Sequence, residues 1–247
     1  MKSTISRPHI LVLLFSFLFS IELNAQIKIT FPSKDGVTVA ADWYLKADSL
    51  PVLLLCHQAH FGRGEYIQTA LTLSDSGFNC LAIDQRYGDE INGVKNETAF
   101  DAERLYKGRS NEDAEQDIIA AIEYLYEKCK KRIIVIGSSY SASLALKTAK
   151  ENNHVFAVAA FSPGEYFATV DFVAKRIRGL NKPVFITSSK KEAKEVTKLV
   201  KDITSMIKVQ YIPMAEGDHG SKVLWRINPY NEEILDCVNE FLKQDEA

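Results

Sequence analysis

Short apolar runs alternate with helical patterns over most of the 247-residue chain, and this order limits the possible folds more than any other feature. Apolar runs typical of buried strands lie at residues 52–56, 80–84, 132–136, 155–161, 183–187 and 208–212. Helical patterns follow or separate them at residues 66–76, 114–128, 192–200 and 231–242. Strands that alternate with helices form a parallel sheet covered on both faces, so the order predicts an α/β fold.

Two earlier runs predict an additional hairpin. Residues 27–31 and 37–44 alternate in character, and the turn-rich stretch between them ends in Lys34-Asp35-Gly36. This arrangement is typical of two antiparallel strands. With the later runs, it predicts a mostly parallel central sheet of about eight strands with helices on both faces, formed by residues 26–247 as a single domain.

The first 25 residues differ from the rest. Lys2 and Arg7 make a positive start, residues 10–21 are almost wholly apolar, and Ala25 follows a short polar break. This layout predicts a secretory signal peptide over residues 1–25, with a buried N-terminal helix as the alternative. The apolar core is shorter than the roughly 20 residues that span a bilayer. We therefore expect cleavage after Ala25, no stable membrane anchor, and export to the periplasm or out of the cell.

Composition excludes two classes of function. The formal net charge is −2 and acidic and basic residues are intermixed, whereas nucleic-acid-binding proteins usually carry a strong basic excess. The four cysteines are too widely spaced for a Cys-x-x-Cys redox or zinc motif. They are Cys56, Cys80, Cys129 and Cys237. We expect no nucleic-acid partner, no metal and no organic cofactor. Some of the cysteines could pair in an oxidising compartment, but buried free cysteine is common and the sequence assigns no disulfide.

The polar stretch at residues 85–110 is long for a loop in a compact domain. It is either a functional flap or a partly helical excursion, and it is too short for a large lid domain. Asn96-Glu97-Thr98 within it matches a glycosylation acceptor, which matters only in a glycosylating secretory pathway.

A small-residue turn marks the candidate reactive centre. Gly137-Ser138-Ser139-Tyr140-Ser141 follows the apolar run that ends at Ile136 and precedes a helical pattern. A strand, a tight turn and a helix are the context of the G-x-S-x-G nucleophile elbow, in which the serine is exposed at the carboxyl edge of the sheet. Ser141 replaces the second glycine of that motif. The alternative is a serine that only caps a helix.

This turn and the segments after it resemble the α/β-hydrolase superfamily, most closely its small lidless esterases and dienelactone-hydrolase-like members, here with serine rather than cysteine at the elbow. The resemblance implies Ser139 as nucleophile and His219, in Gly217-Asp218-His219-Gly220, as its base. It places the triad acid at Glu192, after the run at 183–187, although the usual residue there is Asp. Asp218 and Glu195 are the alternative acids.

Two further segments fit the resemblance. Residues 56–64, Cys-His-Gln-Ala-His-Phe-Gly-Arg-Gly, are similar to the family's oxyanion loop. The implied donors are the backbone N–H of Tyr140 together with that of Gln58 or Ala59. Arg86, in an Asp-x-Arg turn, is expected to have a structural role by pairing with a carboxylate.

The resemblance thus implies hydrolysis of a small-molecule carboxylic ester through an acyl-enzyme, with a Ser-His-Glu triad and no cofactor. Two alternatives remain at this point: an exported serine peptidase of the same fold, and a non-catalytic binding protein on a hydrolase scaffold.

Overall fold

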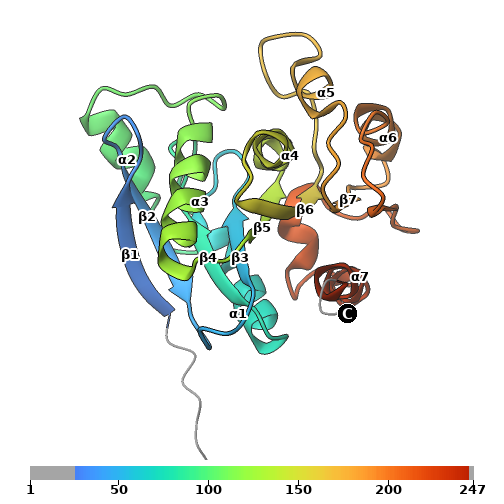
Figure 1. Cartoon of the computed structure of the whole chain (residues 1–247), viewed down its shortest axis with the longest axis horizontal. Helices are drawn as coiled ribbons and strands as arrows, with labels where there is room; N and C mark the ends of the chain where they lie inside the picture. The colour runs from blue at the N-terminus through green and yellow to red at the C-terminus, as the bar shows by residue number, and fades with distance from the viewer. Residues whose placement is uncertain (1–25, 245–247) are drawn as a thin grey trace, which may run out of the picture.

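Eight strands form one sheet at the centre of the computed structural model, which describes residues 26–244 (Figure 1). The predicted signal peptide at residues 1–25 lies outside the described residues. The strands are β1 (Gln26–Pro32), β2 (Thr38–Tyr44), β3 (Val52–Cys56), β4 (Asn79–Ile83), β5 (Ile133–Ser138), β6 (Val155–Phe161), β7 (Val184–Thr187) and β8 (Lys208–Tyr211).

Seven α-helices and two short 3-10 helices connect these strands within residues 26–244. The α-helices are α1 (Ile67–Asp75), α2 (Glu97–Arg104), α3 (Glu115–Cys129), α4 (Tyr140–Glu151), α5 (Phe172–Ile177), α6 (Ala193–Leu199) and α7 (Asn231–Lys243). The 3-10 helices are η1 (Arg63–Tyr66) and η2 (Gly220–Leu224).

The sheet has the strand order β1-β2-β4-β3-β5-β6-β7-β8. β1 pairs with β2, and β2 with β4, in antiparallel fashion, while all later neighbours are parallel. The predicted hairpin and the mostly parallel eight-stranded sheet are both confirmed. Because the carboxyl ends of parallel strands lie at one edge, the loops after β3, β5, β6, β7 and β8 meet there, and this edge carries the candidate site.

Helices cover both faces of the sheet, as the alternating order predicts. In β3, Val52 and Leu54 face a core shared with α3, α4, α5 and α6, whereas Leu53 and Leu55 face a second core shared with α1 and α7. Successive side chains of a strand point to opposite faces, so a strand covered on both sides is apolar throughout. This explains the uninterrupted apolar run in β3.

Residues 85–110 form a partly helical excursion, the second of the two expected arrangements. Asn96 begins α2 by accepting a 2.8 Å hydrogen bond from the Ala99 N–H. Its side-chain amide donates to the carbonyl oxygens of Phe61 and Gln85. Asn96 is 8% exposed, so the glycosylation-acceptor pattern is a helix cap inside the fold and not an accessible acceptor.

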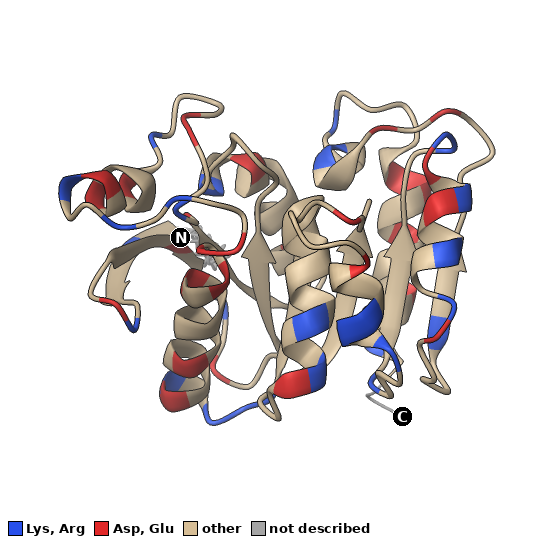
Figure 2. Cartoon of the chain, turned by 90° about the horizontal axis from the view of Figure 1, so that it is seen from above, with Lys and Arg blue, Asp and Glu red and all other residues tan. Residues whose placement is uncertain are grey.

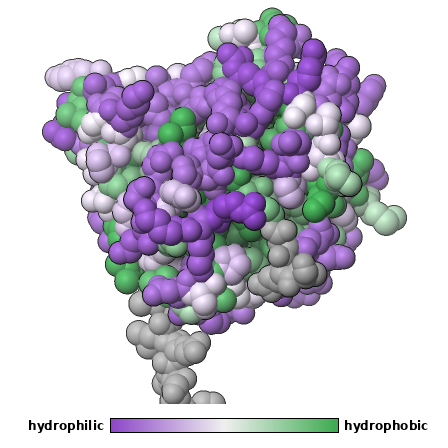
Figure 3. Space-filling view, viewed as in Figure 1, coloured by the Kyte–Doolittle hydropathy of each residue, from purple (hydrophilic) through white to green (hydrophobic). Residues whose placement is uncertain are grey.

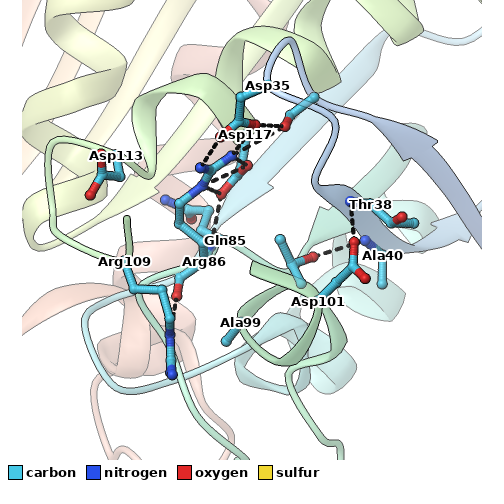
Figure 4. Close-up of polar contacts among 12 residues, drawn as sticks. Asp35, Thr38, Ala40, Gln85, Arg86, Ala99, Asp101, Arg109, Asp113 and Asp117 are labelled. Atoms are coloured by element: carbon cyan, nitrogen blue, oxygen red, sulfur yellow. Dashed lines mark hydrogen bonds and ion pairs between the residues drawn. The ribbon is translucent and has the colours of Figure 1, made fainter. Parts of the chain in front are cut away.

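A buried ion-pair cluster joins the excursion to the rest of the domain (Figure 4). Arg86 is fully buried and donates to Asp117 of α3 and to Asp35 of the β1–β2 turn. Its own backbone N–H also donates to Asp117, at 2.8 Å. Arg86 therefore has the expected structural role: its guanidinium binds Asp35 of the hairpin turn and Asp117 of α3 and so connects these two elements.

Acidic and basic residues are intermixed along the helices. Figure 2 shows Lys and Arg interspersed with Asp and Glu over the helices, and the face in Figure 3 shows apolar residues in small groups among hydrophilic ones. Within residues 26–244, no helix combines the length and the apolar character needed to cross a bilayer.

Candidate active site

Ser139 occupies a strained turn between β5 and α4. Its backbone has φ 60° and ψ −123°, a conformation that a non-glycine residue adopts only when the surrounding structure enforces it. The turn is closely packed, because a Cβ at Gly137 would lie 2.6 Å from the carbonyl oxygen of Ser141. The chain therefore has the strand, tight turn and helix of a nucleophile elbow, with Ser139 at its tip.

Ser141, which replaces the second glycine of the motif, has a specific place in the fold. It is fully buried, and its hydroxyl donates to the carbonyl oxygen of His57 at the end of β3. The hydroxyl oxygen of Ser141 accepts from the side-chain amide of Gln85 at 2.8 Å. The serine thus satisfies polar groups at the junction of three loops and leaves the elbow intact.

The side chains of Ser139, His219 and Glu192 lie together although they are far apart in sequence. The Ser139 hydroxyl donates to Nε2 of His219 at 2.8 Å. Nδ1–H of His219 donates to Oε1 of Glu192 at 2.5 Å. Because a carboxylate can only accept, this pairing assigns the proton to Nδ1 and leaves the Nε2 lone pair facing the hydroxyl.

The second oxygen of Glu192 is held by two serines that the sequence did not single out. Oε2 accepts from the Ser162 hydroxyl at 2.8 Å and from the hydroxyl and N–H of Ser189 at 2.7 and 3.1 Å. Burial alone would raise the pKa of Glu192, but the hydrogen bonds from His219, Ser189 and Ser162 outweigh it and lower the pKa to about 2. The carboxyl is therefore ionised at neutral pH.

Neither alternative acid contacts His219 in the structure. Asp218 accepts a 2.7 Å hydrogen bond from the side chain of Asn228. Glu195 lies on α6 and lines a cavity of about 510 Å³ between α5 and α6. The geometry favours Glu192 over both.

The two candidate oxyanion donors on the loop after β3 differ in the structure. The N–H of Gln58 donates to the buried carboxylate of Glu65 at 2.8 Å and is therefore occupied. The N–H of Ala59 has no acceptor among residues 26–244. On the opposite loop, Tyr140 opens α4, so its N–H has no acceptor within that helix.

The other histidines near this edge have different surroundings. His57 is fully buried between the carbonyl oxygen of Gln58 and the N–H of Gln85, at 2.8 Å from each. Burial outweighs these hydrogen bonds and lowers the pKa of His57 to about 4, so it is a neutral structural residue. His60 is exposed beside Asp89.

Tyr166, on the loop between β6 and α5, is a neighbour of the site that sequence reasoning missed. Its ring meets that of His219 edge-on, with centroids 6.3 Å apart, and its hydroxyl donates to the carbonyl oxygen of Ser162. The side chain of Asn111 fixes the loop by donating to the Tyr166 carbonyl at 2.9 Å. The available signal was Ser162-Pro163-Gly164, a turn directly after a predicted strand.

The described part of the chain offers no metal-binding arrangement: between residues 26 and 244, no three His, Cys, Asp or Glu side chains are grouped to hold an ion. The polar atoms around Ser139 instead form one hydrogen-bonded row of hydroxyl, imidazole and carboxylate. Such a row activates a hydroxyl for attack on an acyl carbon.

Comparison with known proteins agrees with this geometry. Residues 39–215 match the model of the dienelactone hydrolase family, which is well over half of the chain. The chain belongs to the dienelactone hydrolase family. It is therefore a hydrolase of the dienelactone hydrolase and esterase type. No curated protein matches it in sequence.

Solved structures of family members and esterases have the same fold. An esterase of Pyrococcus furiosus superposes with a TM-score of 0.68 at 18% identity, covering 89% of this chain and 91% of that one. A dienelactone hydrolase of Anabaena variabilis gives 0.68 at 14%, covering 88% and 96%. The esterase domain of a Rhodothermus marinus protein gives 0.59 at 16%, covering 87% and 98%. These similarities confirm the predicted α/β-hydrolase fold.

Proposed function

We propose that this dienelactone hydrolase family member hydrolyses carboxylic esters of small molecules through an acyl-enzyme on Ser139. The observation that carries the proposal is the continuous row from the Ser139 hydroxyl through His219 to Glu192. His219 accepts the hydroxyl proton through Nε2 as the oxygen attacks the ester carbonyl. Glu192, ionised at neutral pH, orients the ring and stabilises the imidazolium that forms.

The proton on His219 then passes to the alkoxide leaving group, and the ester bond to the alcohol breaks. Water attacks the resulting acyl-Ser139 ester, giving up a proton to His219, and the acid is released as Ser139 regains its hydrogen. Both steps form a tetrahedral oxyanion. We assign its stabilisation to the N–H groups of Tyr140 and Ala59, because the Gln58 N–H is bound to Glu65.

Hydrolysis of p-nitrophenyl acetate tests the proposal, with aminoacyl p-nitroanilides assayed in parallel. We expect the wild-type protein to cleave the ester at a rate well above that of the heat-denatured protein. Preferential cleavage of the anilides would indicate a peptidase. A folded protein that cleaves neither class would indicate a binding protein.

Glu192 is the triad acid in this proposal, and its replacement by the isosteric amide measures that role. Glu192→Gln is expected to lower kcat by about 10²- to 10⁴-fold, because Gln removes the charge that stabilises the imidazolium and replaces one of the two acceptor oxygens, which bind His219 and the serines, with an NH2 donor. Asp218→Asn and Glu195→Gln are the matched controls, each expected within about twofold of wild type, since neither side chain contacts His219. A silent Glu192→Gln with a slow Asp218→Asn would reassign the acid.

The low pKa of Glu192 also predicts a pH dependence of stability. A carboxyl whose pKa is lower in the folded chain stabilises the fold above its unfolded pKa and loses that contribution as the pH falls toward its folded pKa. For Glu192 this window runs from about 4.5 down to about 2. The difference in Tm between wild type and Glu192→Gln should therefore be constant above about pH 6 and shrink below pH 4.5. If the Tm difference between wild type and Glu192→Gln were the same at pH 3 as at pH 7, the low pKa of Glu192 would be contradicted.

We further propose that residues 1–25 direct export, on the basis of the Lys2 and Arg7 start, the apolar stretch at 10–21 and the small residue Ala25. N-terminal sequencing of the protein from its native cells tests this. A mature chain that begins at Gln26 supports it, and a cytosolic chain that retains residues 1–25 would contradict it.

A further inference from the structure

Glu65, in η1, is a buried carboxylate that the mechanism above does not use. It is 1% exposed. Its Oε2 accepts the 2.8 Å hydrogen bond from the N–H of Gln58. Its Oε1 accepts from the hydroxyl of Ser138 at 2.9 Å and from that of Ser221 at 2.5 Å. One side chain thus binds three segments that are distant in sequence.

Each donor to this carboxylate adjoins a group of the proposed mechanism. Ser138 precedes the nucleophile, Gln58 precedes the oxyanion donor, and Ser221 lies two residues after the base. Glu65 therefore contacts the elbow, the oxyanion loop and the histidine loop through the residues beside their functional atoms.

The same three segments approach one another closely. The N–H of Ser221 donates to the Ser138 hydroxyl at 2.8 Å. At Gly220, where φ is 70°, a Cβ would lie 2.5 Å from the Ser138 hydroxyl oxygen and 2.7 Å from Oε1 of Gln58. With so little free space, a change in the length or hydrogen bonding of Glu65 is transmitted to the neighbouring backbone.

The position is also costly for a carboxylate. Between residues 26 and 244 no Lys, Arg or His lies within ion-pair distance of Glu65, although Lys222 is near enough to interact with its charge. Burial raises the pKa of Glu65 against the hydrogen bonds from Ser221, Gln58 and Ser138 and the charge of Lys222. A buried acid without an ion-pair partner in direct contact costs folding free energy that an apolar side chain would not. A purely structural role does not explain why this unfavourable burial is retained. A requirement for three hydrogen-bond acceptor contacts beside the reacting groups does explain it.

We propose that Glu65 is a positioning residue for ester hydrolysis, whose carboxylate fixes the nucleophile, the oxyanion donor and the base relative to one another. The inference rests on the proposed function of Ser139. Glu65 acts on the reaction geometry through Ser138, Gln58 and Ser221, and does not touch the substrate.

Glu65→Gln tests this role while preserving shape. The amide replaces one of the two carboxylate oxygens with an NH2 donor, which then faces either the Gln58 N–H, which cannot accept, or the Ser138 and Ser221 hydroxyls, which must reverse their hydrogen bonds. We expect either change to shift at least one of the three segments. A misplacement of about 1 Å at a reacting centre costs on the order of 10²-fold in rate. We expect kcat on p-nitrophenyl acetate to fall by about 10- to 100-fold with KM within about threefold, and Ser139 to react with a fluorophosphonate more slowly by a similar factor.

Ser221→Ala is the second variant, because it removes one hydrogen bond to Glu65 and is expected to fold even where Glu65→Gln does not. It should lower kcat by a smaller factor, and the double variant should lose less than the product of the single losses, since both changes act on one network. Asp117→Asn is the matched control: it neutralises an equally buried carboxylate of the Arg86 cluster, lowers Tm, and should leave kcat within about twofold below its melting temperature.

The outcomes separate the inference from the proposed function. Wild type that cleaves the ester, with Ser139→Ala inactive and both Glu65→Gln and Ser221→Ala slow, supports both. Wild-type rates in folded Glu65→Gln and Ser221→Ala, with only Tm lowered, would overturn the positioning role and leave the proposed function standing. A wild-type protein that neither cleaves esters nor reacts with the fluorophosphonate would overturn both.

Discussion

Ser139→Ala is expected to lower kcat for ester hydrolysis by about 10⁴-fold or more, while Tm changes by only a few degrees. The loss is large because the hydroxyl is the only group that forms the acyl-enzyme, and neither His219 nor the oxyanion donors can replace it. Stability changes little because alanine removes only one oxygen. The turn is held by backbone contacts, such as the 2.8 Å hydrogen bond from the Ser139 N–H to the carbonyl oxygen of Phe161.

His219→Ala is expected to cause a loss of similar size, and the double variant with Ser139→Ala no further loss, because the two residues act as one unit. The matched controls are Ser205→Ala on an exposed loop and His154→Ala at the start of β6, both expected at wild-type rates. Steady-state kinetics on p-nitrophenyl acetate and a thermal melt of each variant measure both quantities. Ester hydrolysis that persists in Ser139→Ala would remove this residue from the mechanism.

Arg86→Ala is expected to cause the largest loss of stability of any single change considered, about 3–5 kcal/mol in the free energy of unfolding. The reason is that Asp117 remains fully buried after its cation is removed (Figure 4). Burial raises the pKa of Asp117 even in the presence of Arg86. In contrast, the hydrogen bonds from Arg86 are the main cause that holds the pKa of Asp35 far below its usual range.

Urea unfolding measures this loss, with Arg104→Ala as control. Arg104 pairs with Asp101 at the surface of α2, where its side chain is 59% exposed. An exposed pair of this kind contributes less than about 1 kcal/mol. If both variants lost equally little stability, the Arg86 cluster would not be the main connection between the hairpin turn and α3.

Much of the fold follows from local pattern. Strands such as β3 and β6 are apolar on both faces, so their positions were predicted to within a residue. Helix α5 was missed, because six residues give too little periodicity to distinguish a helix from a loop. The predicted helix at residues 66–76 matches α1 to within a residue, but the 3-10 turn at Arg63–Tyr66 before it was not predicted.

Residues of the candidate site could be predicted only where a chemically suitable residue follows directly on a predicted strand. Ser139, His219 and Glu192 each follow a predicted strand, and the carboxyl ends of parallel strands share one edge, so their proximity follows from topology. That the Gln58 N–H is occupied and the Ala59 N–H is not could not be predicted, because it depends on a hydrogen bond to Glu65. Glu65 and Tyr166 were missed for the same reason: their contacts join segments far apart in the sequence.

Covalent labelling of Ser139 tests the central claim most directly. The folded protein is treated with a fluorophosphonate, and the adduct is located by peptide mass spectrometry in wild type, Ser139→Ala and Ser138→Ala. We predict a single phosphonyl group on Ser139 in wild type, retained at the same residue in Ser138→Ala and absent from Ser139→Ala. A wild-type protein that stays unlabelled, or that carries the adduct at another residue, would contradict the assignment of Ser139 as the nucleophile.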